Sequence, residues 1–526
     1  MIDLGINLFQ EIAALGGGGG GYPITNSLRF NDNDSAYLSR TPSVTSNRKT
    51  WTWSGWVKRG NVGTAQGIFN ANTTTNSDND CALFFRDTSV LQFSFNNSAV
   101  NIGLLQTSQV FRDVSGWYHI IFVFDTGNAT ASERMKIYVN GARVTSFTNE
   151  TYPPLNAESV FNSAIPHSIS ALRPTGPTNL FDGYLAETNF IDGQALTADD
   201  FGQIDETTGE WSPKRYAGTY GTNGFYLPFD GNANDDSGNG NNWTENNLAS
   251  TDYMIDTPTN NFATLNPNFR GGETGESLAE GNLYYNSGDG DENYVCASQS
   301  VSTGKWYFEI LPSSSDTNGV YGFTNADSLI QSTAVGTNPY DTNNGGMIRP
   351  DGNGSPDYKI NSTSTSISVT TNSVFGIALD ADTGGIEFFE NGVSVGSGTI
   401  TGITNYIPFA SMHSGSAGRI GIANFNFGAD SSFAGNKTRQ GNTDANGKGD
   451  FYYAPPAGGY LALCTDNLPA PVIEQPETQF NVVTYTGNGT SQAITGVGFQ
   501  PDFVWIKQRN STASHQLQDS VRGAGK

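Results

Sequence analysis

The stretch Gly116-Trp-Tyr-His-Ile-Ile-Phe-Val-Phe-Asp125, followed by Lys136-Ile-Tyr-Val-Asn-Gly141, decides the fold of this chain. The first segment is an apolar run that ends in an acid, which is typical of a strand buried on both faces. The second is a short strand closed by Asn140-Gly141, a strong signal for a tight hairpin turn. Together these segments predict a β-sheet core.

The composition of the whole chain agrees with an all-β protein. Its 526 residues are enough for several domains, only 14% of them are charged, 12% are aromatic, and 63 are glycine. Short apolar runs separated by polar turns favour sandwiches or barrels. The net charge of −24 argues against nucleic-acid partners, because such a surface repels phosphate.

The sequence gives no sign of disulfides, of a membrane-spanning segment or of a secretory signal. The three cysteines, Cys81, Cys296 and Cys464, lie far apart, so we expect buried thiols rather than a disulfide framework. The sequence holds no run of 18 apolar residues, so we expect no membrane insertion. The N-terminus has neither a basic region nor a cleavage site, so we expect no secretory signal.

Residues 1–21 form a unit of their own. Leu4, Leu8, Ile12 and Leu15 share one helical face, and the tract Gly16–Gly21 follows as a flexible linker. We expect this short helix to dock onto a larger assembly or to self-associate. The alternative is that it caps the first domain.

The rest of the chain is predicted to contain two large β-domains and a smaller third unit. The predicted boundaries are 22–230 for the first domain, 231–269 for a connector, 270–430 for the second domain, 431–479 for a Pro/Gly-rich linker and 480–526 for the third unit. The third unit is too short for a core of its own, so we expect it to be incomplete.

Three sets of motifs in the first domain resemble a known family. They are Trp53-Ser-Gly-Trp-Val-Lys58, the two segments quoted above, and Phe181-Asp-Gly-Tyr-Leu-Ala-Glu187. In this order they resemble the laminin-G-like, or concanavalin A-like, modules that are common in tail proteins of bacteriophages. The resemblance implies a jelly-roll β-sandwich that binds glycans or proteins.

Motifs of the second domain resemble the SPRY family in order. They are Gly304-Lys-Trp-Tyr-Phe-Glu-Ile310, Gly376-Ile-Ala-Leu-Asp380, Ile386-Glu-Phe-Phe-Glu-Asn-Gly392, Tyr406-Ile-Pro-Phe-Ala410 and Ile422-Ala-Asn-Phe425. The resemblance implies a second sandwich that binds partners through loops. The third unit, with Phe503-Val-Trp-Ile-Lys507, resembles a small β-module that accompanies these two in phage tail fibres.

The three modules in this order resemble a bacteriophage tail fibre or spike. That resemblance implies a virion protein, located on the particle surface, that attaches to a host-cell glycan or protein and forms a homo-oligomer. Residues 1–21 would then contact other virion proteins. Alternatives are a capsid decoration or head-fibre protein, a surface polysaccharide depolymerase and a cellular adhesin.

A loop rich in Asp, Asn and Gly is the best candidate for a metal site. Oxygen ligands at Asp230, Asn232, Asn234 and Asp236 alternate along it, in a pattern that suits calcium. The alternative is a series of turns in which these side chains bond their own backbone. A second acidic loop, Asp289–Glu292, is a weaker candidate.

Three tyrosines in loops rich in Pro, Asn and Gly are candidate platforms for sugar stacking. Tyr152, Tyr340 and Tyr358 are the aromatic side chains that we expect to be most exposed. Each has an alternative role as an ordinary loop aromatic.

No motif predicts catalysis. His119 lies within the buried-strand pattern and is expected to be a core or edge histidine, and the sequence has no phosphate-binding loop. Glycosidases on concanavalin A-like sandwiches pair two carboxylates on one strand face, as in E-x-D-x-x-E, which is absent here. Glu187 and Glu309 are single acids in predicted strands. We therefore expect a binding protein and not an enzyme.

Overall fold

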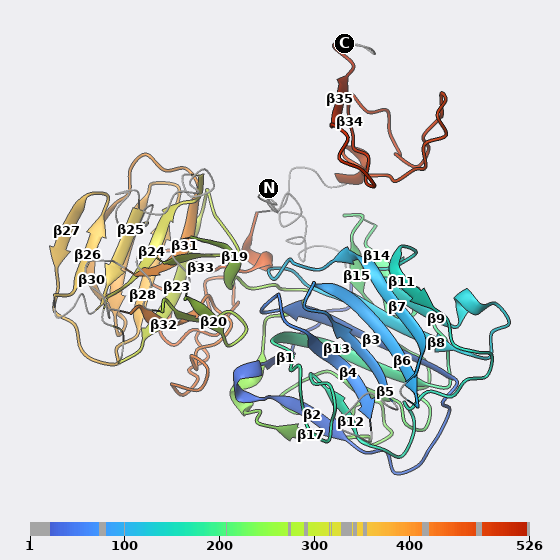
Figure 1. The fold of residues 1–526 in the computed structure, drawn as a ribbon. Helices are drawn as coiled ribbons and strands as arrows, with labels where there is room; N and C mark the ends of the chain where they lie inside the picture. The colour runs from blue at the N-terminus through green and yellow to red at the C-terminus, as the bar shows by residue number, and fades with distance from the viewer. Residues whose placement is uncertain are drawn as a thin grey trace.

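The computed structural model describes residues 21–72, 80–98, 100–206, 208–271, 275–288, 293–314, 316, 318–327, 339, 345–350, 355–412, 420–469 and 476–522. These residues form two large antiparallel β-sandwiches and a separate two-stranded hairpin (Figure 1). The expected all-β fold with tandem sandwiches is confirmed. The predicted helix, residues 1–15, lies outside the described residues.

The first sandwich consists of two facing sheets. One sheet has the strand order β10 (Ala142–Arg143), β9 (Met135–Val139), β8 (Tyr118–Asp125), β3 (Thr50–Arg59), β13 (Gly183–Asp192), β1 (Ser27–Phe30) and β18 (Tyr253–Met254), with β16 (Phe225–Leu227) also paired to β13. The other has the order β11 (Phe147–Thr151), β7 (Val100–Val110), β6 (Val90–Asn97), β5 (Asp80–Phe85), β4 (Gln66–Asn72), β12 (His167–Ile169), β2 (Tyr37–Arg40) and β17 (Thr244–Asn246). A small ribbon of β14 (Gly202–Ile204) and β15 (Trp211–Pro213) lies outside both sheets.

The second sandwich has the same two-layer plan. One sheet has the order β19 (Leu265–Gly271), β22 (Tyr294–Ala297), β31 (Tyr406–Met412), β24 (Gly319–Asn325), β25 (Gly345–Arg349), β26 (Asp357–Ile360) and β27 (Thr363–Ser366). The other has the order β20 (Ser277–Ala279), β21 (Tyr284–Asn286), β32 (Ile422–Asn426), β23 (Lys305–Pro312), β28 (Phe375–Asp380), β29 (Gly385–Glu390) and β30 (Val393–Thr399), with β33 (Leu461–Ala462) parallel to β23. The hairpin near the C-terminus pairs β34 (Phe503–Ile506) with β35 (Gln516–Asp519).

Strand β8 confirms the prediction of a strand buried on both faces. It lies between β3 and β9, and its even-numbered residues Phe122 and Phe124 pack into the core between the two sheets. Its odd-numbered residues Ile121 and Val123 pack on the opposite face against a smaller cluster that includes Phe201. A covering layer on the outer face therefore explains why the apolar run is continuous rather than alternating.

The turn at Asn140-Gly141 also matches its prediction. Val139 of β9 pairs with Ala142 of β10, so these two residues alone form the loop. Both have positive φ angles, +46° and +80°, as a type I′ hairpin requires. Gly141 lies so close to Trp211 that a Cβ atom there would approach the indole ring to 2.4 Å.

The predicted boundaries of the connector and of the linker need correction. Within 231–269, β17 pairs with β2 and β18 pairs with β1, so the part up to Met254 completes both sheets of the first sandwich, whereas β19 of the second sandwich begins at Leu265. Within 431–479, Phe451, Leu463 and Cys464 are fully buried in the core of the second sandwich. Both segments are rich in turn residues, and that composition concealed the short strands that they contain.

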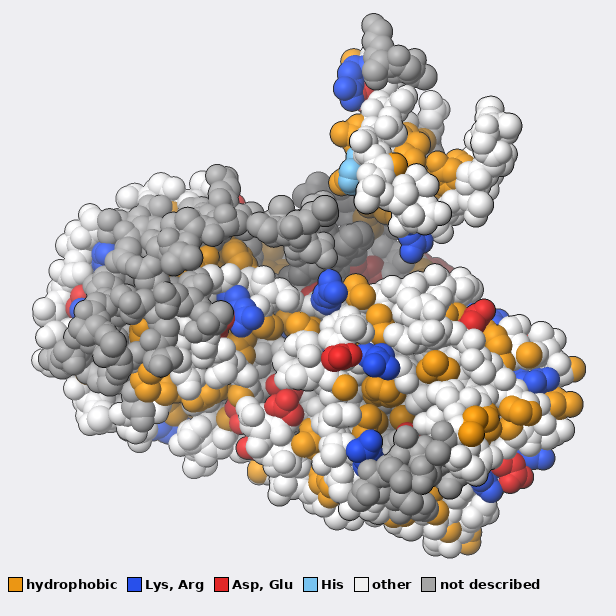
Figure 2. Space-filling view, in the orientation of Figure 1, with side chains coloured by type: hydrophobic (Ala, Val, Ile, Leu, Met, Phe, Trp, Pro, Cys, Tyr) orange, Lys and Arg blue, Asp and Glu red, His pale blue; other side chains and the backbone are white. Residues whose placement is uncertain are grey.

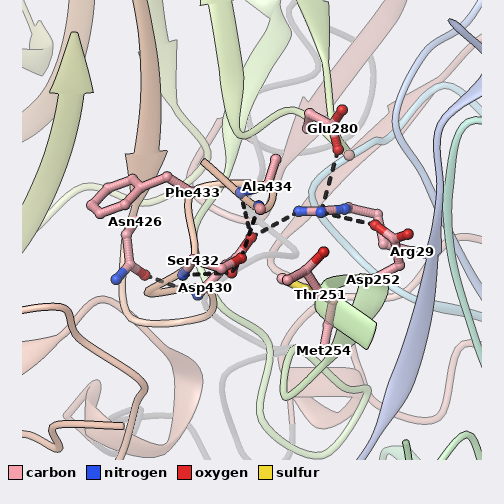
Figure 3. Close-up of polar contacts among 12 residues, drawn as sticks. Arg29, Thr251, Asp252, Met254, Glu280, Asn426, Asp430, Ser432, Phe433 and Ala434 are labelled. Atoms are coloured by element: carbon pink, nitrogen blue, oxygen red, sulfur yellow. Dashed lines mark hydrogen bonds and ion pairs between the residues drawn. The ribbon is translucent and has the colours of Figure 1, made fainter. Parts of the chain in front are cut away.

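Buried charges join the two sandwiches. Arg29 of β1 is 1% exposed, and its guanidinium lies 3.1 Å from Asp430 of the second sandwich, 3.0 Å from Asp252 and 3.3 Å from Glu280 (Figure 3). Lys58 of β3 forms a second buried pair, at 2.7 Å, with Asp256 between β18 and β19, and donates at 3.1 Å to the carbonyl of Phe262, which packs in the core of the second sandwich. Removing one partner of such a pair leaves a buried charge without its counter-charge and strongly destabilises a protein. These pairs therefore favour one arrangement of the two sandwiches.

Candidate functional site

The outer face of the β4–β7 sheet carries a polar groove. Along β5, Cys81, Leu83 and Phe85 point into the core of the sandwich, so Ala82 and Phe84 point outward. The same alternation on β6 places Leu91, Phe93 and Phe95 in the core. Gln92, Ser94 and Asn96 therefore point outward into the groove. The groove has a volume of about 340 Å³ and is lined by Ala65, Asp80, Ala82, Phe84, Arg86, Asp87, Gln92, Ser94, Asn96, Asn101, Leu172, Arg173 and Asn179.

Strand register places the polar side chains of the groove in rows. Asp80 of β5 lies opposite Asn96 of β6, and Asn96 lies opposite Asn101 of β7. In the rows alongside, Ala82 lies opposite Ser94, and Phe84 lies opposite Gln92. Since directly opposed side chains on one face are neighbours, the floor of the groove combines amide and hydroxyl groups with one aromatic ring.

Hydrogen bonds hold one wall of the groove in place. The Asn70 side chain donates to the Cys81 carbonyl at 2.9 Å and to the Asp80 carboxylate, and it accepts from the backbone N–H of Arg173 at 2.8 Å. Arg173 has a positive φ of +58°, an uncommon conformation for a residue other than glycine. Asn70 therefore ties the loop that contains Arg173 to the edge of the groove.

The electrostatics of the groove are nearly balanced. Burial raises the pKa of Asp80 to about 6, although Asn70 and Arg173 both act in the opposite direction. On the other side, Arg86 donates to the side chain of Gln92 at 3.1 Å and lies 3.8 Å from Asp87. Two acids and two arginines thus line the groove, an arrangement suited to an uncharged polar ligand.

The predicted calcium loop is extensively bonded to itself and its surroundings. The side-chain oxygen Oδ1 of Asn232 accepts from the backbone N–H of Asn234 at 2.8 Å, and the side-chain Nδ2 of Asn232 donates to the Asp230 carboxylate at 3.4 Å. Asp236 lies 3.5 Å from Arg215. Hydrogen bonds of this kind are expected if the loop is a series of turns, the alternative to a calcium site. Among the described residues, no three His, Cys, Asp or Glu side chains cluster as a metal site.

Asp235 organises that loop, although it was not among the predicted ligands. Its carboxylate accepts from the backbone N–H groups of Tyr226, Ser237 and Asn241 at 2.8–2.9 Å. Calcium binding by Asp230, Asn232, Asn234 and Asp236 stays a prediction. Asp289–Glu292, the second acidic loop, lies outside the described residues.

The candidate tyrosines are less exposed than expected. Tyr358 is half-buried, stacks on Phe388 with ring centroids 5.5 Å apart, and lies over Gly396. Tyr152 is also half-buried and donates to Glu150 at 3.3 Å. Both rings are thus partly covered by neighbouring residues, and sugar stacking by Tyr152 and Tyr358 stays a prediction. Tyr340 lies outside the described residues.

His119 is a core histidine, as predicted. It is 1% exposed, and burial lowers its pKa to about 3. Its Nε2 lies 2.9 Å from Ser54 Oγ, and its Nδ1 accepts from Trp211 Nε1 at 2.9 Å. The ring is stacked with Trp56 on one side and Trp211 on the other. The three cysteines are also buried and free, as expected.

The two single strand acids lie in different sandwiches and have internal partners. Glu187 of β13 accepts from Tyr226 at 2.8 Å, and burial raises its pKa to about 7. Glu309 of β23 accepts from the backbone N–H groups of Tyr452 and Tyr453 at 2.8 and 2.7 Å. Burial also raises the pKa of Glu309 to about 7. Glu309 thereby binds the segment that was predicted to be a linker to the second sandwich.

Sequence reasoning missed the groove. A usable signal was present, because Asp80–Phe85 and Val90–Asn97 both alternate, with polar residues on the face opposite the apolar one. That pattern predicts a two-faced sheet, but it does not reveal that Leu172 and Arg173 form a wall above it.

Comparison with known proteins supports the expected fold of the first sandwich. Residues 31–201 match the family described as the concanavalin A-like lectin/glucanases superfamily. The first sandwich is concanavalin A-like. Residues 475–526 match a family described as a domain of unknown function, DUF7483. A search of curated proteins finds no match.

Similar solved structures have low sequence identity to the chain. The SPRY domain of human HERC1 is 16% identical, covers 30% of this chain and 97% of its own, and has a TM-score of 0.25. A pentraxin from Limulus polyphemus is 18% identical, with coverages of 34% and 80% and a TM-score of 0.25. A putative carbohydrate-binding protein from Bacteroides ovatus is 15% identical, with coverages of 43% and 60% and a TM-score of 0.28.

Proposed function

We propose that this chain binds a glycan in the groove over β5, β6 and β7. The observation that carries the proposal is the groove floor, where Asn96, Ser94 and Gln92 lie in adjacent rows beside Phe84. Binding sites for small polar ligands combine a concave surface with a few convergent polar groups. The match of the first sandwich to a lectin and glucanase superfamily supports the same conclusion.

The chemistry of the groove suits a neutral sugar. Amide side chains both donate and accept hydrogen bonds, so Asn96 and Gln92 can each contact two neighbouring hydroxyl groups. Phe84 offers an aromatic surface for the apolar face of a sugar ring. The two acids and two arginines of the groove offset one another, so a strongly charged polysaccharide gains no net attraction from them.

The proposed role is recognition without catalysis. A retaining or inverting glycosidase needs two carboxyl groups on either side of the scissile bond. In the groove, Asp80 bonds to Asn70, and Asp87 lies beside Arg86. Glu187 and Glu309 lie in other parts of the molecule and have the internal partners described above. We therefore propose no hydrolytic reaction for this chain.

We further propose that the chain is a virion attachment protein, a tail fibre or spike on a phage particle. The order of the modules supports this role, as does the strongly acidic composition. In this role residues 1–21 contact other virion proteins, while the sandwiches face the host cell. In the described part of the chain, no helix is long and apolar enough to cross a membrane.

Binding of the full chain to purified polysaccharide from host surfaces tests the proposal. We expect saturable binding, weakened about three- to tenfold by Asn96→Ala, since one lost hydrogen bond is worth about 0.5–1.5 kcal/mol. Phe84→Ala should weaken binding to a similar degree. Asn149→Ala is the matched control, because Asn149 is an exposed amide on β11 of the same sheet but outside the groove.

The results distinguish a glycan site that lies elsewhere on the molecule from the absence of glycan binding. Binding that neither Asn96→Ala nor Phe84→Ala changes would move the glycan site away from the groove. Absence of saturable binding to polysaccharides from any susceptible host would overturn glycan recognition itself.

A further inference from the structure

The loop that forms one wall of the groove has little conformational freedom. Leu172 and Thr178 exchange two backbone hydrogen bonds of 2.9 Å, which close the loop between them. Pro174 and Pro177 lie within that loop, and proline fixes its own φ angle. A wall that is already ordered costs little entropy when a ligand binds against it.

Arg173 occupies a strained position in this loop. Its φ of +58° is uncommon for a residue other than glycine, and Pro174 favours extended backbone at the residue before it. The Asn70 side chain holds Arg173 in place by accepting from its backbone N–H at 2.8 Å. Strained residues are concentrated at ligand-binding sites, where the surrounding structure imposes their conformation.

The guanidinium of Arg173 has donors available to a ligand. Arg173 lines the groove, and within the described ranges its side chain forms neither a hydrogen bond nor an ion pair. Arg86, the other arginine of the groove, already donates to Gln92 and lies beside Asp87. Because a guanidinium carries five N–H donors in a planar fork, Arg173 is the larger unused set of donors in the groove.

Asp80 supplies an acceptor near that guanidinium. Its Oδ1 accepts from the Asn70 side chain, and its Oδ2 takes no part in that bond. Arg173 acts on Asp80 by attraction, but the two side chains do not form a direct ion pair. The space between them suits a group that both donates and accepts a hydrogen bond, and a hydroxyl is such a group.

A neutral sugar fits this pair of residues better than an acidic one. A carboxylate on Arg173 would also approach Asp80, and like charges repel each other. A hydroxyl can donate to Asp80 while its oxygen accepts from Arg173, and a second N–H of the fork can reach the oxygen of the neighbouring hydroxyl. Figure 2 shows charged side chains of both signs scattered over one face of the first sandwich, which agrees with an uncharged ligand.

We propose that Asp80 and Arg173 together bind two adjacent hydroxyl groups of a neutral sugar unit and thereby determine which sugars the groove accepts. This inference rests on the proposed glycan binding in the groove and names the part of the glycan that is recognised. A sugar unit without a free hydroxyl at this point cannot donate to Asp80. Sites built to hydrogen-bond a hydroxyl reject analogues that lack it, because their polar groups are then left unpaired.

The ionisation of Asp80 provides a test that a purely structural role would not pass. Burial raises the pKa of Asp80 to about 6. Its carboxyl is faced by Asn70 of β4, Asn96 of β6 and Arg173, and the other charged residues of the groove are Arg86 and Asp87. Since binding uses the ionised carboxylate, of which about one-tenth remains at pH 5, affinity should be about tenfold lower at pH 5 than at pH 7.

Binding of the full chain to a purified neutral polysaccharide from host surfaces, at pH 5 and pH 7, tests the proposal. Asp80→Asn and Arg173→Gly should each weaken binding at pH 7 by about 10- to 100-fold, as expected for a hydrogen bond to an ionised group. Asp80→Asn should also remove the difference between the two pH values. Glycine tolerates the positive φ, so Arg173→Gly should melt close to the wild type. Arg112→Gly, at an exposed arginine outside the groove, is the matched control.

The failure of this inference differs from the failure of the proposed function. Binding that Asn96→Ala weakens, but that Asp80→Asn and Arg173→Gly leave unchanged, would keep the glycan in the groove and overturn the roles of Asp80 and Arg173. Equal wild-type affinity at pH 5 and pH 7, or tighter binding of an acidic polysaccharide, would also overturn them. Absence of saturable binding by the wild type would overturn the proposed function, and this inference with it.

Discussion

Replacing Arg29 by Ala should destabilise the protein by about 3–5 kcal/mol, because it leaves the carboxylates around Arg29 without their cation. Asp252 and Glu280 are 17% and 18% exposed, so water can partly solvate them. Asp430 is 1% exposed and cannot be hydrated without opening the junction of the two sandwiches. Most of the loss should therefore arise at Asp430.

The pH dependence of this loss follows from the pKa of Asp430. Burial alone raises that pKa, but Arg29, together with Ser432 and Arg439, outweighs burial and holds the pKa below its usual value. A lowered folded-state pKa contributes stability above the unfolded value of about 3.8, and that contribution is lost as the pH falls. The difference between wild type and Arg29→Ala should therefore be largest at neutral pH and should shrink only as the pH falls below about 3.8.

Urea unfolding at pH 7 and at about pH 3 measures both effects. Arg48→Ala is the control, since Arg48 forms an exposed pair with Glu158 and such pairs contribute about 0–1 kcal/mol. A double-mutant cycle with Asp430→Asn should give a coupling energy well above 0.5 kcal/mol. The reasoning is refuted if Arg29→Ala costs no more than Arg48→Ala, or if the two substitutions at the junction are additive.

Two further predictions concern buried Glu309 and the Asp230 loop. Burial raises the folded-state pKa of Glu309 to about 7 from an ordinary value of 4.5, so its protonated form contributes stability that is present below pH 4.5 and lost as the pH rises to 7. The urea midpoint should therefore fall between pH 5 and pH 8 by more in the wild type than in Glu309→Gln; equal changes would contradict this assignment. If the loop of Asp230, Asn232, Asn234 and Asp236 binds calcium, chelation by EGTA should lower the melting temperature, and Asp230→Ala should remove that sensitivity. An unchanged melting curve would leave the loop as a series of turns.

Much of the fold was predictable because its causes are local. The run before Asp125 predicts a doubly buried strand from hydrophobicity alone, and β8 has that burial. Asn140-Gly141 predicts a two-residue turn because both residues tolerate positive φ, and they adopt it. Catalytic motifs such as E-x-D-x-x-E can also be searched for in the sequence alone, because each has a fixed spacing between its residues.

The candidate site was harder to predict because its parts come from distant segments. The polar face of β5 and β6 is visible as alternation, whereas the wall at Leu172 and Arg173 is placed by the tertiary structure. For the tyrosines, local sequence suggested more exposure than the tertiary structure gives. Tyr358 follows a segment rich in Pro and Gly, which suggested exposure, but its ring stacks on Phe388 of another strand.

The sequence by itself determined the long apolar strand β8 and the turn at Asn140-Gly141, since backbone preference and burial period act over a few residues. Only the tertiary structure decided that residues 231–254 complete the first sandwich and that residues 431–468 belong to the second. It also decided the partners of Arg29, which lies 401 positions from Asp430 along the chain. A buried charge needs a partner, but the choice of partner depends on which distant segments the closed sheets bring together.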